Sequence, residues 1–208
     1  EGESGWSKCT LKDGDRVFGD YNQGGIRGKT PYILDRFDLT YMKEFDFVHS
    51  GNYCYTESQL SKMKAAGIKI SFDFSDDSSK EYYEQYAQYV DYAFCSFDGT
   101  DKEAEEHLKF IHSLGPELAS VTRGSKGCMM YDGNRFYVQP AKLIDNVVDT
   151  MGAGDSFLAI FMDSYIDGLH NGMEKSDAIT RALQDAAEFA AEICRIDGAF
   201  GYGMPYKD

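Results

Sequence analysis

The sequence predicts an α/β fold in which a mainly parallel sheet carries helices on both faces. Two observations support this prediction. From about residue 31 onward, short apolar segments alternate with longer amphipathic ones, a pattern typical of successive strand–helix units. The first thirty residues break the alternation, because they form a strand-like pair followed by a glycine-rich stretch. We therefore expect a small β segment with a linker at 1–30 and an α/β core at 31–208.

The N-terminal segment is predicted to be a β-hairpin. Two strand-like runs, 6–11 and 16–21, flank the dipeptide Asp13-Gly14, which is a strong signal for a tight turn. The polar, glycine-rich residues 22–30 are expected to form a linker or a mobile loop.

The core elements follow from apolar periodicity and from turn residues. Gly67 ends the first predicted helix as a C-cap, and Asp132-Gly133-Asn134 joins the last two strands as a hairpin. Residues 155–168 are apolar nearly all round, which predicts a centrally buried helix. The predicted strands are 45–49, 68–74, 92–96, 118–122, 128–131 and 135–138, and the predicted helices are 56–66, 79–89, 101–114, 155–168 and 174–197.

Composition limits the classes of function. The 208 residues are 42% hydrophobic and 14% aromatic, which is typical of a globular protein. The formal net charge of −14 makes nucleic acid or an anionic membrane a poor partner. No apolar run has the length of a membrane span, and five scattered cysteines show no metal-ligand spacing. These features predict a cytoplasmic protein with reduced thiols.

The most informative segment runs from Val148 to Phe157. It leads from an apolar strand through Gly152, Ala153 and Gly154 into a helix. Small residues let a ligand approach the backbone closely, and the N–H groups at the start of a helix attract anions. The segment therefore predicts an anion hole for a phosphoryl group, with the carboxylate of Asp155 beside it as a general base. A glycine-rich turn that merely starts a helix is the structural alternative.

The string Asp-Thr-x-Gly-Ala-Gly-Asp, at 149–155, resembles the signature of the ribokinase-like (PfkB-type) sugar kinases. This resemblance implies a three-layer sandwich with a projecting β-lid, residues 1–30 being part of the lid. It also implies ATP and Mg²⁺ as cofactors, Asp155 as the base, and Gly152, Ala153 and Gly154 as the anion hole. The reaction would be transfer of a phosphoryl group to an alcohol.

A second string, Thr122-x-Gly124-x-x-Gly127, resembles the element that lines the nucleotide in the same family. The resemblance implies that Thr122, Gly124 and Gly127 bind the cofactor. Lys126 and Arg123 are expected either to neutralise nucleotide phosphates or to be solvated surface cations. Asp149 is expected to contribute to the cofactor site and to orient the loop before the helix.

The lid string 15–21, with 72–76 and 148–157, resembles the branch of the family that comprises the bacterial fructoselysine 6-kinases. This resemblance implies transfer of the γ-phosphate of ATP to the 6-hydroxyl of a fructosamine. Arg16, Phe18 and Tyr21 would contact the substrate; alternatively, the lid aromatics form a homodimer interface. Other PfkB-type kinases, acting on a ketohexose, ribose, ketodeoxygluconate or a nucleoside, and a non-catalytic nucleotide-binding remnant remain alternatives.

The sequence departs from the family pattern at two places. The initial βα unit with its sugar-binding aspartate and Gly-Gly-Asn element is absent, so the N-terminal part of the fold is expected to be missing. The Asn-x-x-Glu element that helps hold magnesium is replaced by a segment containing Asp98, so the metal ligands stay open. His107 and His112 lie on a polar helix and are expected to be solvated.

Overall fold

The structure is a computed structural model that describes residues 1–12, 15–76, 79–199 and 201. The predicted turn Asp13-Gly14 lies outside the described residues. The chain divides into two compact units, each made of several segments. The first comprises Glu1–Ser7, Tyr21–Arg123 and Met129–Val138, and the second comprises Lys8–Asp20, Gly124–Cys128 and Gln139–Asp208. The predicted boundary near residue 30 stays a prediction.

A six-stranded sheet in the order β3-β4-β5-β6-β7-β8 forms the centre of the first unit. The strands β3 to β6 pair in parallel, with Gly51 opposite Asp73, Asp73 opposite Phe94, and Ser96 opposite Thr122. Their carboxyl ends therefore meet at one edge of the sheet, and the predicted mainly parallel sheet is confirmed. The strands are β3 (Val48–Gly51), β4 (Ile70–Asp73), β5 (Tyr92–Ser96), β6 (Leu118–Thr122), β7 (Cys128–Tyr131) and β8 (Phe136–Gln139).

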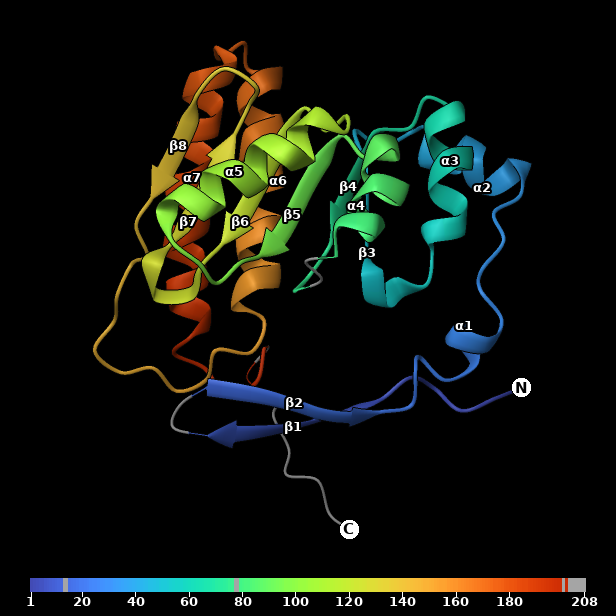
Figure 1. Cartoon of the computed structure of the whole chain (residues 1–208), viewed down its shortest axis with the longest axis horizontal. Coiled ribbons are helices and arrows are strands. Elements are labelled where there is room, and N and C mark those ends of the chain that lie inside the picture. Colours follow the sequence, from blue (N-terminus) through green and yellow to red (C-terminus); the bar gives the residue numbers. More distant parts are fainter. Residues whose placement is uncertain (13–14, 77–78, 200, 202–208) are drawn as a thin grey trace. The chain divides into compact units, whose positions relative to one another are not determined.

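Three helices connect the parallel strands and lie on one face of this sheet (Figure 1). They are α3 (Glu57–Ala65), α4 (Lys80–Tyr86) and α5 (Asp101–Ser113). Each strand pairs with the next one along the chain, so right-handed crossovers place all three helices on the same side. A capping box between Thr100 and Glu103 starts α5, which ends within a residue of the predicted boundary.

Two short helices were not predicted. Helix α1 (Ile26–Lys29) occupies part of the expected linker. Helix α2 (Arg36–Met42) begins at a capping box in which Asp35 accepts from the backbone of Asp38 and Asp38 accepts in return. Three-residue 3₁₀ turns, η1 (Asn52–Cys54), η2 (Ala87–Tyr89) and η3 (Gly124–Lys126), complete the connections.

The core of the first unit lies between the sheet and the connecting helices. Leu60, Ile70, Phe72 and Leu108 are fully buried there, and Phe74 stacks on Tyr83 with 4.6 Å between ring centroids. His107 differs from its predicted solvation, because its half-buried ring stacks on Phe97 at 5.0 Å. Burial lowers the pKa of His107 below its ordinary 6.5.

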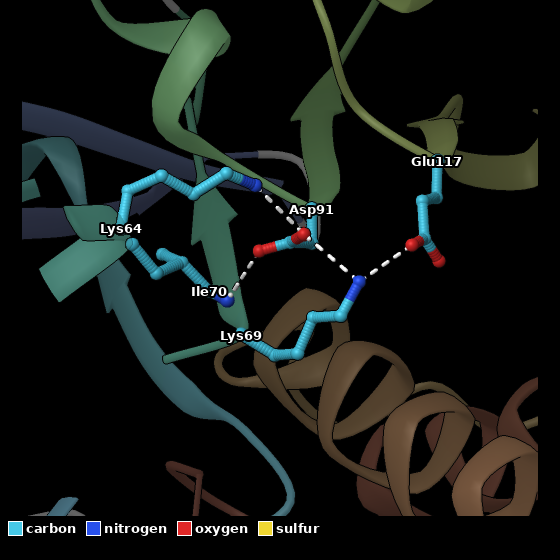
Figure 2. Close-up of polar contacts among 5 residues, drawn as sticks. All are labelled: Lys64, Lys69, Ile70, Asp91 and Glu117. Carbon is cyan, nitrogen blue, oxygen red and sulfur yellow. Dashed lines mark hydrogen bonds and ion pairs between the residues drawn. The ribbon is translucent and has the colours of Figure 1, made fainter. Parts of the chain in front are cut away.

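A buried carboxylate joins the amino ends of three parallel strands (Figure 2). Asp91, which precedes β5, accepts hydrogen bonds from the Nζ atoms of Lys64 (2.8 Å) and Lys69 (3.1 Å) and from the backbone N–H of Ile70 (2.9 Å). Lys69 also pairs with Glu117, which precedes β6. Burial by itself raises the pKa of Asp91, but these donors outweigh it and the pKa lies below its ordinary value.

The second unit contains the hairpin and the two long C-terminal helices. Strands β1 (Ser7–Lys12) and β2 (Asp15–Tyr21) form a two-stranded sheet, which confirms the predicted hairpin, and they run in opposite directions (Figure 1). Helices α6 (Ala153–His170) and α7 (Lys175–Ile193) pack side by side. Buried Ala182 and Ala186 and the close approach of Gly168 to Ala178 allow this packing. Among the described residues, no helix has the length and apolar character needed to cross a membrane.

Candidate active site

The glycine string forms the start of α6, as predicted. Gly152 is the N-cap and has a φ of 76°, in the left-handed region that glycine adopts most readily. A Cβ atom at this position would lie 2.6 Å from the Cβ of Ala199, so space as well as conformation requires glycine. No side chain of the described residues caps the helix. The first turn is therefore left open to a ligand.

The backbone N–H groups of this turn are those of the predicted anion hole. Those of Gly152, Gly154 and Asp155 find no acceptor among the described residues. The structure differs from the prediction at Ala153, whose N–H donates to the carbonyl of Thr150 at 3.2 Å. Unsatisfied N–H groups at the positive end of an 18-residue helix are suited to bind a phosphoryl group.

Asp155 lies in the first turn of the same helix with its side chain exposed. Its carboxylate makes no hydrogen bond or ion pair with any other residue that the structure describes. A carboxylate without a protein partner is free to accept a proton from a bound hydroxyl. This geometry fits the predicted base, although an acidic residue here also stabilises the helix dipole.

A pocket of about 520 Å³ lies at this turn. Side chains alternate between the faces of a strand, so Arg16 and Phe18 lie on the same face of β2. Tyr21 lies on the opposite face of β2 and is not among the lining residues. Its predicted substrate contact therefore stays a prediction. The pocket is lined by Arg16, Phe18, Thr150, Met151, Gly152 and Asp155.

Arg16 is held by Asp149 rather than left free in the pocket. Its guanidinium donates through Nε to Oδ1 of Asp149 at 2.8 Å and through Nη2 to Oδ2. The Asp149 side chain is only 2% exposed, whereas that of Arg16 is 23% exposed. Arg16 also lines the pocket, so its predicted contact with the substrate stays a prediction, although the guanidinium fork is already engaged by Asp149.

Asp149 also organises its own loop, as predicted. Its carboxylate accepts from the backbone N–H of Met151 at 3.0 Å and from that of Gly198 at 2.9 Å. The hydrogen bond from Arg16 lowers the pKa of Asp149 most, burial opposes this, and the two N–H groups add to the lowering. The carboxylate thus stays ionised at neutral pH and fixes the residues that precede α6.

The second motif follows β6. Thr122 is the last residue of that strand, and Gly124 and Gly127 have φ values of 53° and 89°. A side chain at Gly127 would clash with the carbonyl oxygen of Gln139. Lys126 is exposed in η3. The nucleotide-binding role of these four residues remains a proposal.

Arg123, in contrast, is neither a solvated surface cation nor available to phosphate. Its side chain is 6% exposed, and Nη1 pairs with Asp101 at 2.7 Å. Nη2 donates to the carbonyl oxygen of Gly99 at 2.9 Å. The arginine is therefore a structural link between the end of β6 and the start of α5, which corrects both predictions made for it.

The residues present fit a nucleotide phosphate better than they define a metal site. The open N–H groups of the α6 turn have the chemistry that a phosphate requires. Within the described residues, no group of three or more His, Cys, Asp or Glu side chains could hold a metal ion. Mg²⁺ keeps most of its waters and needs few protein ligands, so Mg²⁺ stays a prediction without assigned ligands.

Residues 21–199 match the pfkB family of carbohydrate kinases. The chain belongs to this family. It is 37% identical to fructosamine kinase FrlD of Bacillus subtilis (strain 168), over 99% of this chain and 70% of that protein. It is 30% identical to fructoselysine 6-kinase of Escherichia coli (strain K12), over 96% of this chain and 72% of that protein. The predicted family and its fructoselysine 6-kinase branch are confirmed as the chain's relatives.

Solved structures confirm the ribokinase-like fold. The ribokinase of Giardia lamblia superposes with a TM-score of 0.79 at 15% identity, over 95% of this chain and 68% of that one. The microbiome-derived acarbose kinase Mak1 superposes with a TM-score of 0.70 at 25% identity, over 91% of this chain and 62% of that one. The chain thus spans somewhat less than two thirds of Mak1. The predicted carbohydrate kinase is confirmed at the level of the family.

Proposed function

We propose that this chain carries the phosphoryl-transfer site of an ATP-dependent kinase acting on the 6-hydroxyl of fructoselysine or a related fructosamine. The observation that carries the proposal is the Asp155 carboxylate, which has no partner among the described residues and lies beside the open N–H groups at the start of α6. The names of the two relatives described above support a fructosamine as the acceptor.

Each part of the pocket has a separate task in this proposal. Asp155 accepts the proton of the attacking hydroxyl, which makes the oxygen a better nucleophile. The N–H groups of Gly152 and Gly154 stabilise negative charge on the transferring phosphoryl group. Phe18 covers the acceptor and excludes water, which would otherwise compete as a nucleophile. ATP, when bound, supplies the phosphoryl group.

The decisive variant is Asp155→Asn, which keeps the shape of the side chain and removes the base. We expect phosphoryl transfer to fall by about 10²- to 10⁴-fold, the range for general-base catalysis, while ADP binding is retained. Asp163→Asn, an exposed carboxylate further along α6, is the matched control and should keep full activity. Initial rates of ATP turnover and calorimetric ADP titrations measure the two effects.

The acceptor is tested by comparing fructoselysine, fructose, ribose and ketodeoxygluconate in the same coupled assay. Turnover with fructoselysine well above that with the others supports the proposed substrate. A preference for another sugar retains the kinase and refutes the fructosamine assignment. ADP binding without turnover on any sugar would favour the non-catalytic nucleotide-binding alternative. A homodimer through the hairpin and a cytoplasmic location remain predictions.

A further inference from the structure

We propose that Arg16 is a positioning residue that acts through Asp149, holding the residues before α6 in the conformation that the anion hole requires. This inference rests on the proposed function and deepens it. The observation behind it is the bidentate contact of Arg16 with the carboxylate of Asp149. The same carboxylate accepts hydrogen bonds from the backbone N–H groups of Met151 and Gly198.

The contact joins three segments that are far apart in sequence. Arg16 comes from β2, Asp149 precedes α6 by four residues, and Gly198 follows α7. The carboxylate of Asp149 receives all its donors from the other two segments and from its own loop. One buried anion therefore determines where these segments meet.

Removing the guanidinium would leave this carboxylate buried without a counter-charge. A buried unpaired carboxylate is costly, so the loop would rearrange to bring Asp149 to water. That rearrangement would break the hydrogen bonds to Met151 and Gly198, and Met151 is the residue directly before Gly152. The orientation of the N–H groups in the first turn of α6 would change with it.

The chemistry of the contact favours arginine over lysine. The planar guanidinium matches both carboxylate oxygens at once, whereas an ammonium group provides a single point charge. The same contact fixes the register of β2 against the loop, and it thereby places Phe18 on the wall of the pocket. Arg16 therefore contributes to the pocket without touching the reacting atoms.

Kinetics of four variants test the inference: Arg16→Met, Arg16→Lys, Asp149→Asn and the Arg16→Met/Asp149→Asn double variant. We expect Arg16→Met to lower kcat at least about tenfold with KM for the sugar changed less than about threefold, which is the sign of a contribution made only in the transition state. Arg16→Lys should recover part of the loss. The double variant should be no slower than the slower single variant, because both substitutions disrupt the same Arg16–Asp149 contact.

Arg181→Met is the matched control, because it removes an arginine–aspartate pair between α6 and α7 that is largely exposed. It should leave kcat unchanged. The inference is overturned if the losses of the single variants multiply in the double variant. A rise in KM for fructoselysine that is absent with fructose would also overturn it, because Arg16 would then bind the substrate directly.

Hydrogen–deuterium exchange provides a readout that does not depend on activity. In Arg16→Met, peptides that cover residues 148–157 and 195–199 should exchange faster, while the central part of α7 keeps its protection. Unchanged exchange in both peptides, or a uniform increase over the unit, would refute the positioning role. If the wild-type protein transfers no phosphate, the proposed function fails while this experiment still decides the inference.

Discussion

At the scale of single residues, Asp149 and Asp155 lie in contrasting environments. The two carboxylates lie six positions apart, yet Asp149 is buried and fully hydrogen-bonded, whereas Asp155 is exposed and has no partner within the part of the chain that the structure describes. Sequence alone assigned both to the site. It did not predict that the guanidinium of Arg16 binds Asp149, because the contact spans 133 positions along the chain.

His107 also belongs to this scale and gives a prediction about acid stability. Its folded pKa lies below 6.5 because burial disfavours the charged ring. The unfolded chain therefore binds the proton more readily, so stability that is present above pH 6.5 is lost as the pH falls toward the folded pKa. Urea unfolding midpoints at pH 7.5 and pH 5.5 should show this loss.

The variant His107→Phe keeps an aromatic ring between Phe97 and Tyr83 and cannot titrate. We expect it to lose less stability than the wild type between these two pH values. Above pH 7.5 the stabilities of the two proteins should change in parallel. An equal loss in both proteins between pH 7.5 and pH 5.5 would show that His107 does not titrate differently on unfolding.

At the scale of elements, local sequence signals predicted the ends of most helices and strands. They failed where contacts with other segments determine those ends. The strand Tyr92–Ser96 and the strand Leu118–Thr122 were predicted to the residue, because apolar runs end there at polar turns. The first strand of the six-stranded sheet was predicted at 45–49 but is β3, Val48–Gly51. Its bounds are determined by its pairing with β4. The capping box of Asp35 and Asp38 was the available signal for α2.

Asp91, Lys64, Lys69 and Glu117 form a cluster of polar contacts at the amino ends of β4, β5 and β6. This cluster stabilises the three strand ends as a unit. Asp91→Ala removes the acceptor of a buried backbone N–H and of two lysines, and should cost about 1–3 kcal/mol of unfolding free energy. Glu117→Gln weakens only a half-exposed pair and should cost less than about 1 kcal/mol. Denaturant unfolding measures both, and equal costs would contradict the central role of Asp91.

At the scale of the whole molecule, the net charge of −14 opposes the approach of a polyanionic nucleotide. The local field of the α6 turn favours phosphates at short range, because the N–H groups at a helix start carry partial positive charge. For the proposed substrate ATP, a short-range attraction would therefore act inside a long-range repulsion. These two effects respond differently to salt.

We predict that the association rate of ATP rises as NaCl increases from about 10 to about 150 mM, because screening shortens the repulsion to a range of about 8 Å. Adenosine, which is uncharged, is the control and should associate at a constant rate. Stopped-flow mixing with fluorescent analogues of ATP and of adenosine measures both. A rate that falls with salt would show that a local positive field dominates the encounter.

The sequence by itself determined the α/β class, the positions of most core elements and the family, because apolar periodicity and the glycine string are local features of the chain. It also determined that Asp155 follows the glycine string at the start of a helix. Only the tertiary structure decided that Arg16 binds Asp149, that Arg123 binds Asp101, that Phe18 faces the pocket and that His107 is half-buried. These properties depend on which distant segments come into contact. Those contacts, rather than the local sequence, determine how far each side chain is buried and which charged group it pairs with.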